Sequence, residues 1–258
     1  MRVAFLRILM VLGFLLSLSG AARAANVLYW ADSWSGTDYW TPALTARGDT
    51  VTSATSSADL VTRLTAGTWD VVIISENSNN TSSIWVTAIA SYISAGGRVV
   101  VNNWYTDAGL EAATQTSIIS TNQTVATINA AGIAAGLAAG ISTNPVTLTN
   151  AGWGVFSHSL GLAPASGAES LCDFPDGSCA VLGNAGRTLR LGFIPDGLPA
   201  ADGARFLQNA LGIVLGSVPP PPPPPLATVP VPTLSQWSLG ALAVLMSLAM
   251  FRHRRSRQ

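Results

Sequence analysis

Lysine is absent from this 258-residue chain, and histidine occurs only at His158 and His253. All thirteen acidic residues lie between residues 25 and 251, where arginine supplies six positive charges, so this region has a net charge of −7. A folded region with this charge and no lysine does not attract polyanions. The composition therefore argues against nucleic acid or anionic lipid as the partner of the central region.

The common motifs of catalysis and nucleotide binding are also missing. The chain has no G-x-x-x-x-G-K-[ST] phosphate loop, no G-x-G-x-x-G after a strand and no H-E-x-x-H. Nucleophilic catalysis needs a base beside the nucleophile, and His158 is the only histidine of the central region. Asp173 and Asp176 are too few ligands for calcium, and turn formation explains them. We expect no catalytic residue, no metal site and no cofactor.

Cysteine is limited to Cys172 and Cys179, which frame the segment CDFPDGSC. Pro-Asp-Gly is typical of a turn and places the two cysteines on facing strands of a hairpin. In an oxidising compartment such a pair forms a structural disulfide, and the histidines that a metal-binding pair uses are missing. We predict a disulfide between Cys172 and Cys179.

The first 24 residues have the composition of an export signal. Arg2 and Arg7 precede the apolar run ILMVLGFLLSLSG, and Ala22 and Ala24 fit the A-x-A pattern of a cleavage site. The run is short for a membrane span, which favours cleavage over an uncleaved anchor. We predict a signal peptide over residues 1–24 that signal peptidase removes.

Residues 25–217 are predicted to form one α/β domain. The segments NVLYW, DVVIIS and RVVVNNW are short apolar strands, and SADLVTRLTAGTW and SSIWVTAIASYISAGG are helices between them. This alternation is typical of a doubly wound, mostly parallel sheet with helices on both faces. The later half is less regular and ends in the strand TLRLGFIPD and the helix ADGARFLQNALGIVLG.

Strands and helices of the domain carry a resemblance to a known fold, in the segments SYISAGGRVVV, GRTLRLGFIPDG and ADGARFLQNALGIV. They resemble the class I glutamine amidotransferase-like fold in its noncatalytic, ThuA-like secreted branches. The resemblance covers residues 26–216 and implies a flavodoxin-like or amidotransferase-like sheet. Catalytic members carry a nucleophile on a tight turn after a central strand. The matching stretch, VVVNNWYTDAG, has Asn102, Asn103 and Trp104 there and neither cysteine nor serine. The fold is therefore implied, and amidotransferase activity is not.

Aromatic and polar side chains follow three of the predicted strands. Ligands of doubly wound sheets bind beyond the carboxyl ends of the strands, and flat rings mixed with hydrogen-bonding groups suit a sugar. We expect a binding surface with extracellular polysaccharide as a candidate ligand. Its candidate residues are Asp32, Trp34, Glu76, Asn102, Asn103 and Trp104, with Trp30, Tyr39, Trp40 and Tyr105 nearby.

Two other interpretations of these residues stay open. In one, the tryptophans pack over the sheet edge and the polar side chains only cap helices and turns. In the other, Asp32 and Glu76 are the catalytic carboxylates of a secreted, glycan-directed hydrolase, which requires them to lie about 5–10 Å apart across a cleft.

A proline-rich linker over residues 218–230 follows the domain. Seven consecutive prolines form a stiff polyproline II rod of about 20 Å. The apolar segment counted from Val229 to Phe251 has 23 residues, enough to span a membrane. Arg252, Arg254 and Arg255 then hold the end on the cytoplasmic side, with the domain outside. We predict a transmembrane helix in the inner membrane.

Residues 231–258 begin with VPTLSQWS, which resembles the IPTL-CTERM sorting signal, a relative of PEP-CTERM: I-P-T-L-x-x-W-G, an apolar helix and an arginine cluster. The matching positions are Pro232, Thr233, Leu234 and Trp237. Val231 replaces isoleucine and Ser238 replaces glycine. The resemblance implies recognition by an exosortase, a membrane transpeptidase that cleaves near the motif and transfers the protein to the cell surface or to extracellular polymer. The alternative is a permanent tail anchor on a periplasmic protein.

Overall fold

The computed structural model of the chain describes residues 24–32, 37–149 and 159–216. The predicted signal peptide up to Arg23, together with Trp34, His158, the linker and the sorting segment, lies outside the described residues. Within the described ranges, no helix has the length and apolar character that a membrane span requires.

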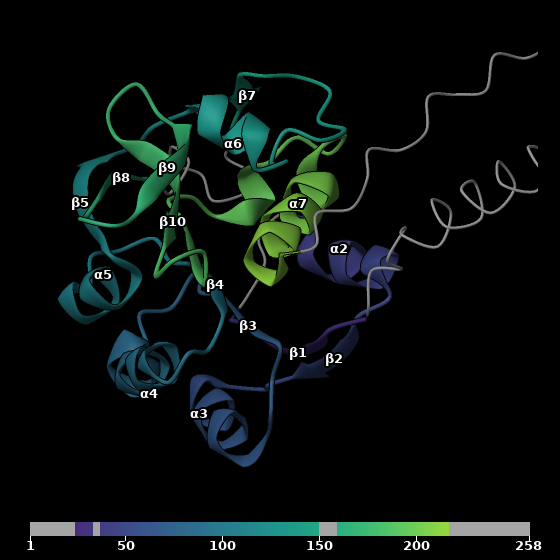
Figure 1. Ribbon diagram of the computed structural model, residues 1–258, viewed down its shortest axis with the longest axis vertical. Coiled ribbons are helices and arrows are strands. Elements are labelled where there is room, and N and C mark those ends of the chain that lie inside the picture. Colours follow the sequence, from purple (N-terminus) through teal and green to yellow (C-terminus); the bar gives the residue numbers. More distant parts are fainter. Residues whose placement is uncertain (1–23, 33–36, 150–158, 217–258) are drawn as a thin grey trace, which may run out of the picture. The chain divides into compact units, whose positions relative to one another are not determined.

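Helices and strands alternate in the first half of the domain, and strands dominate the second half (Figure 1). The helices are α2 (Trp40–Arg47), α3 (Ser57–Ala66), α4 (Ser82–Ser94), α5 (Ala108–Thr114), α6 (Ala130–Ala134), the 3-10 helix η1 (Pro195–Gly197) and α7 (Gly203–Leu215). The strands are β1 (Asn26–Ala31), β2 (Thr50–Ser53), β3 (Val71–Ser75), β4 (Val99–Asn102), β5 (Thr116–Thr121), β6 (Val125–Ile128), β7 (Val146–Thr147), β8 (Leu160–Pro164), β9 (Glu169–Asp173), β10 (Ser178–Gly183) and β11 (Thr188–Leu191).

Local signals explain where several helices begin and end. Helix α2 ends at Gly48, which has the left-handed backbone (φ 72°) that glycine adopts without strain. Helix α3 begins after Ser56, whose Oγ accepts the N–H of Asp59 at 3.0 Å. Helix α5 begins after Asp107, whose carboxylate accepts the N–H of Leu110 at 2.9 Å. The polar side chains thus satisfy amides that have no partner within the helices.

The first half of the sheet is parallel. Strands β2, β1, β3, β4 and β11 pair in that order, which is the 2-1-3-4-5 order of flavodoxin-like sheets. Every residue of β3 and β4 is buried, because helices cover both faces of the sheet. The predicted two-sided α/β arrangement is confirmed for this half.

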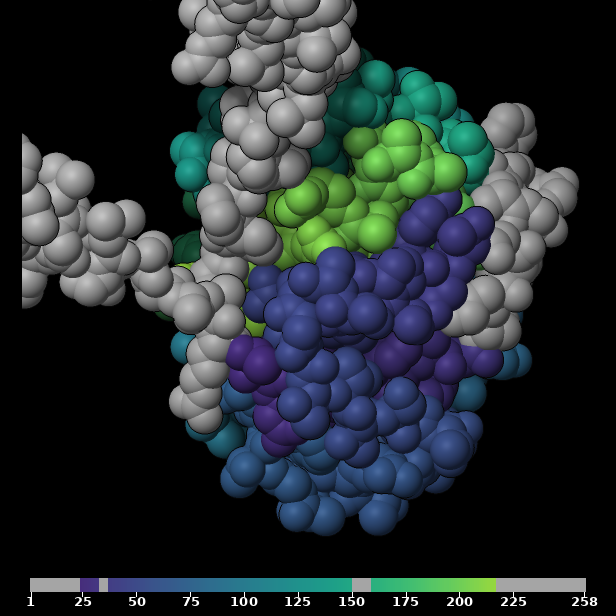
Figure 2. Space-filling view, turned by 90° about the vertical axis from the view of Figure 1, so that its right-hand side faces the viewer, coloured from purple at the N-terminus to yellow at the C-terminus, as the bar shows by residue number. Residues whose placement is uncertain are grey.

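Successive residues of β1 contribute to two different cores. Val27 and Tyr29 pack beneath α2 and α7, and Leu28 and Trp30 pack beneath α3, α4 and α5. Figure 1 shows α3, α4 and α5 on one side of the sheet and α2 and α7 on the other. In Figure 2, α2 in indigo and α7 in yellow-green lie side by side.

The second half of the sheet is antiparallel, so the sheet as a whole is mixed rather than mostly parallel. Strand β10 pairs with β11 and β9, β9 pairs with β6, and β6 pairs with β7. Strands β8 and β5 form a branch that begins at β10. Several of these strands are joined by short turns, which favour antiparallel pairs because a parallel pair needs a long crossover.

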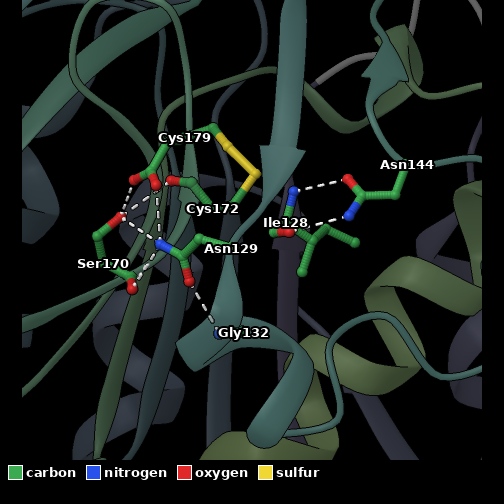
Figure 3. Close-up of a disulfide and its surroundings, with 8 residues drawn as sticks. Ile128, Asn129, Gly132, Asn144, Ser170, Cys172 and Cys179 are labelled. Carbon is green, nitrogen blue, oxygen red and sulfur yellow. Dashed lines mark hydrogen bonds between the residues drawn. A yellow bond between two sulfur atoms is a disulfide. The ribbon is translucent and has the colours of Figure 1, made fainter.

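The predicted disulfide is present. Cys172 and Cys179 are bonded across the turn between β9 and β10, and neither has exposed surface (Figure 3). The side chain of Asn129, at the start of α6, donates to the carbonyl oxygen of Ser170 at 3.0 Å and to the carboxylate of Asp173 at 2.9 Å. A loop this short gives the disulfide a chain-entropy contribution of about 2–3 kcal/mol.

Candidate functional site

The carboxyl ends of β1, β3 and β4 meet where the strand order reverses, the usual place for a ligand in this kind of sheet. Hydrogen bonds join the segments that follow these three strands. The predicted site residues that the structure describes lie in these segments: Asp32, Glu76, Asn102, Asn103 and Trp104. Trp34 lies outside the described residues.

Asp32 fixes the loop that follows β3. Its carboxylate oxygens accept the main-chain N–H groups of Asn77 at 2.6 Å, Ser78 at 2.9 Å and Asn79 at 2.6 Å. The N–H groups of three successive residues partly neutralise the negative charge of the carboxylate, and the carboxylate in turn holds the loop in one conformation. Asp32 therefore joins the end of β1 to the loop after β3.

A buried group of polar side chains joins the ends of β3 and β4. The hydroxyl oxygen of Ser75 lies 2.8 Å from Asn102 Oδ1 and 3.1 Å from Asn77 Oδ1. Asn102 Nδ2 donates to Asn77 Oδ1 at 3.0 Å. All three side chains are buried, and buried polar groups are tolerated when they bond one another in this way.

Glu76 has no exposed surface and accepts hydrogen bonds from three residues. Thr81 donates its N–H at 2.7 Å and its hydroxyl at 2.6 Å, Trp85 Nε1 donates at 3.4 Å, and the Tyr105 hydroxyl donates to the second oxygen. Burial raises the pKa of Glu76, and the bonds from Thr81 and Tyr105 oppose this shift. Burial, and next the bond to Glu76, raise the pKa of the Tyr105 hydroxyl well above its ordinary value. Glu76 thus connects the start of α4 with the loop after β4.

Arg190, on β11, is a buried charge that is not among the predicted site residues. Its Nη2 donates to Asn103 Oδ1 at 3.0 Å and its Nη1 donates to Thr116 Oγ1 at 3.0 Å. Burial lowers the pKa of Arg190 to about 10, and the carboxylates of Glu111 and Asp107 oppose this shift. The guanidinium therefore stays charged at neutral pH. The signal in the sequence was an arginine inside the apolar strand TLRL.

The aromatic residues near the site divide into core and partly exposed groups. Trp30, Tyr39 and Trp40 are buried in the cores beside the sheet and offer no face to a ligand. Trp104 and Tyr105 are half-buried, with ring centroids 5.5 Å apart and planes at 89°. Among the described aromatic residues that follow β1 and β4, these two are partly exposed.

The hydrogen bonds of this site hold its loops in place. Asn103 donates from Nδ2 to the carbonyl oxygen of Tyr105 at 2.7 Å and accepts from Arg190. Glu76 has no exposed surface with which to reach a substrate. Among the described residues, no cluster of three or more His, Cys, Asp or Glu side chains is arranged to hold a metal ion.

The comparison with known protein families supports the sorting-signal part of the sequence interpretation. Residues 229–257 match the IPTL-CTERM motif. Such a signal implies export, processing by an exosortase-type system and membrane-anchored sorting toward the cell surface. No curated protein matches the chain.

Solved structures similar to the chain include both predicted classes. The cytoplasmic protein STM1381 from Salmonella typhimurium LT2 has a TM-score of 0.51 at 13% identity, over 73% of this chain and 99% of that one. A glutamine amidotransferase from Methylobacillus flagellatus has a TM-score of 0.46 at 7% identity, over 77% and 97% of the two chains. A ThuA-like protein from Parabacteroides merdae has a TM-score of 0.44 at 9% identity, over 78% and 94%. At these identities the likeness concerns the fold alone.

Proposed function

We propose that this chain is an exported protein that an exosortase-type enzyme cleaves near the Pro232-Thr233-Leu234 sequence and transfers to the cell surface or extracellular polymer. Its domain over residues 25–217 then acts outside the cell as a noncatalytic binding or structural module. The observation that carries the proposal is the match of residues 229–257 to the IPTL-CTERM motif. The predicted signal peptide, linker and arginine tail agree with this order of segments.

The interior of the candidate site supports a noncatalytic role. A general acid or base must reach the reacting atom, whereas Asp32 binds three main-chain amides and Glu76 has no exposed surface. Asn103, in the stretch that resembles the nucleophile turn and has neither cysteine nor serine, is hydrogen-bonded through both atoms of its amide. These contacts favour a module over the secreted hydrolase that uses Asp32 and Glu76.

For the ligand, we favour an extracellular polysaccharide at the surface formed by Trp104 and Tyr105. A half-buried ring offers an apolar face to a sugar and is held rigidly enough to lose little entropy on binding. In this arrangement the rings of Trp104 and Tyr105 contact the polysaccharide. The loops that carry the rings are positioned by Asp32, Glu76, Asn102 and Asn103. Trp34 remains a candidate contact from the sequence.

The sorting step is tested by the intact mass of the protein from its native host, with and without the exosortase-type enzyme. We expect loss of the C-terminal segment only when the enzyme is present. The double variant Pro232→Ala, Thr233→Ala should keep the tail, whereas Ser235→Ala, at a position where the motif allows any residue, should be processed normally. A wild-type chain that still ends at Gln258 would mean a permanent tail anchor.

The binding role is tested separately with Trp104→Ala on a glycan array and on the extracellular polymer of the host. Trp69→Ala is the matched control, because Trp69 is also half-buried but precedes β3, at the opposite edge of the sheet. We expect Trp104→Ala to weaken binding at least about tenfold, which corresponds to about 1.4 kcal/mol of binding free energy. Equal binding by the wild type and both variants rules out this surface.

A further inference from the structure

Two carboxylates accept hydrogen bonds from the backbone N–H groups of Ala25 and Asn26, at the start of the folded domain. The N–H of Ala25 donates to Asp49 Oδ1 at 3.0 Å, and the N–H of Asn26 donates to Asp70 Oδ2 at 2.8 Å. The carbonyl oxygen of Ala25 accepts the N–H of Thr50 at 2.8 Å. Ala25 is only 5% exposed, whereas Ala24 is exposed. Ala25 is therefore held by hydrogen bonds through both its N–H and its carbonyl oxygen.

The side chain of Asp49 is completely buried, and one of its two oxygens is paired with a charged group. Its Oδ2 lies 2.9 Å from Nε of Arg47, and the two side chains are 0% and 3% exposed. Its Oδ1 faces the nitrogen of Ala25. A buried carboxylate is stable when both oxygens meet charged or hydrogen-bonding partners. Figure 2 shows the purple start of the described chain beside the indigo residues of α2, the helix that ends at Arg47.

The predicted cleavage site lies at this position. The A-x-A pattern of Ala22 and Ala24 places the scissile bond between Ala24 and Ala25. Hydrolysis adds one water, which leaves a carboxylate on Ala24 of the leader and an α-ammonium group on Ala25. We propose that Asp49 is the receptor for this α-ammonium group, so that maturation replaces an amide-to-carboxylate hydrogen bond with a buried ion pair between the Ala25 ammonium and Asp49, whose other oxygen stays paired with Arg47. The proposal rests on the export and leader removal of the proposed function.

The charged groups around the new amino terminus determine its reactivity. Asp49 faces it directly from the turn after α2, Arg47 faces Asp49 from the last turn of α2, and Asp70 is bound to the next residue. An opposite charge this close raises the pKa of the α-amino group above its ordinary value of about 8. The neutral amine that reacts with acylating reagents then becomes about tenfold scarcer at pH 7.

The absence of lysine makes this amine measurable in the intact protein. The chain contains no lysine, so an acetylating ester of N-hydroxysuccinimide has the α-amino group as its only amine target. The test uses the full chain from Ala25 to Gln258 in detergent, produced with Ala25 as its first residue. Intact mass follows the addition of one acetyl group with time. The reference is a chain that begins at Ala24, whose amine is displaced from Asp49 by one residue.

We expect the Ala25 chain to be acetylated about tenfold more slowly than the Ala24 chain at pH 7. Asp49→Asn should remove the protection, whereas Asp70→Asn, which changes the neighbouring carboxylate, should keep it. Equal acetylation rates for the Ala25 and Ala24 chains overturn the proposal. This comparison does not need the Asp49→Asn variant, so it holds even if that variant fails to fold. Equal protection in the wild type and a folded Asp49→Asn variant overturns it too, because burial alone then protects the amine.

The in vivo step has its own readout. N-terminal sequencing of the protein from its native host should give Ala25 as the first residue. Another first residue would overturn the maturation step and the predicted cleavage site, while the acetylation rates still report whether Asp49 binds an ammonium group. A chain that retains Met1 would refute leader removal itself, independently of C-terminal sorting.

Discussion

Glu76 gives the sharpest test of how the loops at the carboxyl edge of the sheet are held. Its carboxylate is buried and accepts hydrogen bonds from Thr81, Trp85 and Tyr105. Thr81 directly precedes α4, Trp85 lies within α4, and Tyr105 follows β4. Glu76→Ala removes the acceptor from all of these donors. Glu76→Gln keeps one carbonyl oxygen for Thr81 and Trp85, and its amide can donate to the Tyr105 hydroxyl oxygen.

The two substitutions should differ strongly in their cost. A hydrogen bond to a charged group contributes about 1.5–3 kcal/mol, but half-exposed Thr81 and Tyr105 regain part of this from water. We expect Glu76→Ala to lower the free energy of unfolding by about 3 kcal/mol, mainly because buried donors lose their partner. Glu76→Gln should lower it by less than about 1 kcal/mol, because the shape and most of the bonds are kept.

The pH dependence separates the charge from the hydrogen bonds. Because burial raises the pKa of Glu76 in the folded state, its contribution to stability is fully present below the ordinary glutamate pKa of about 4.3. This contribution is lost as the pH rises through the folded-state value. Wild-type stability should therefore fall over this window relative to Glu76→Gln, which does not titrate.

Urea unfolding of the mature chain, followed by tryptophan fluorescence between pH 4 and pH 8, measures both effects. Two results would refute the reasoning. One is a loss for Glu76→Gln as large as that for Glu76→Ala. The other is a pH profile that is the same for Glu76→Gln and the wild type.

Three further substitutions, at two positions, test the buried arginine and the packing of α6 with the same unfolding assay. Arg190→Met removes a buried charge while filling its space, so we expect a change of less than about 1 kcal/mol; Arg190→Ala leaves a cavity and should cost about 3 kcal/mol. Similar losses for both would mean that the bonds to Asn103 and Thr116 matter more than packing. Gly132→Ala places a Cβ 2.0 Å from the carbonyl oxygen of Leu171 and should cost about 1–3 kcal/mol. An unchanged unfolding midpoint would show that α6 moves away from β9 freely.

Several features of this protein could be predicted from the sequence because their signals are local. Strands β3 and β4 are buried on both faces, so they are continuous apolar runs. Cys172 and Cys179 flank a Pro-Asp-Gly turn, which brings the two thiols together without help from distant segments. The sorting signal is recognised in the linear order of its residues, and the match of residues 229–257 confirms it.

Only the tertiary structure decided which polar residues meet. Asp32 and Asn77 are separated by 45 positions, Glu76 and Tyr105 by 29, and Asn103 and Arg190 by 87. Such pairs are set by strand order and register, which single residues do not encode. Apart from the Cys172–Cys179 hairpin, the antiparallel pairs of the sheet were missed for a related reason: the pairing partners of short strands depend on the turns between them.

The aromatic residues show the same limit. Tryptophan has a large apolar body and a polar N–H, so its composition suits both a core and a sugar-binding surface. Trp30 and Trp40 became core residues because the alternation of β1 and the position of α2 point them inward, whereas Trp104 kept exposed surface on a loop. The sequence by itself determined the positions of the strands and helices described above and the sorting signal, because these depend on residues that are neighbours in the chain. The tertiary structure alone decided which side chains remain at the surface, because burial depends on what packs against them from elsewhere in the chain.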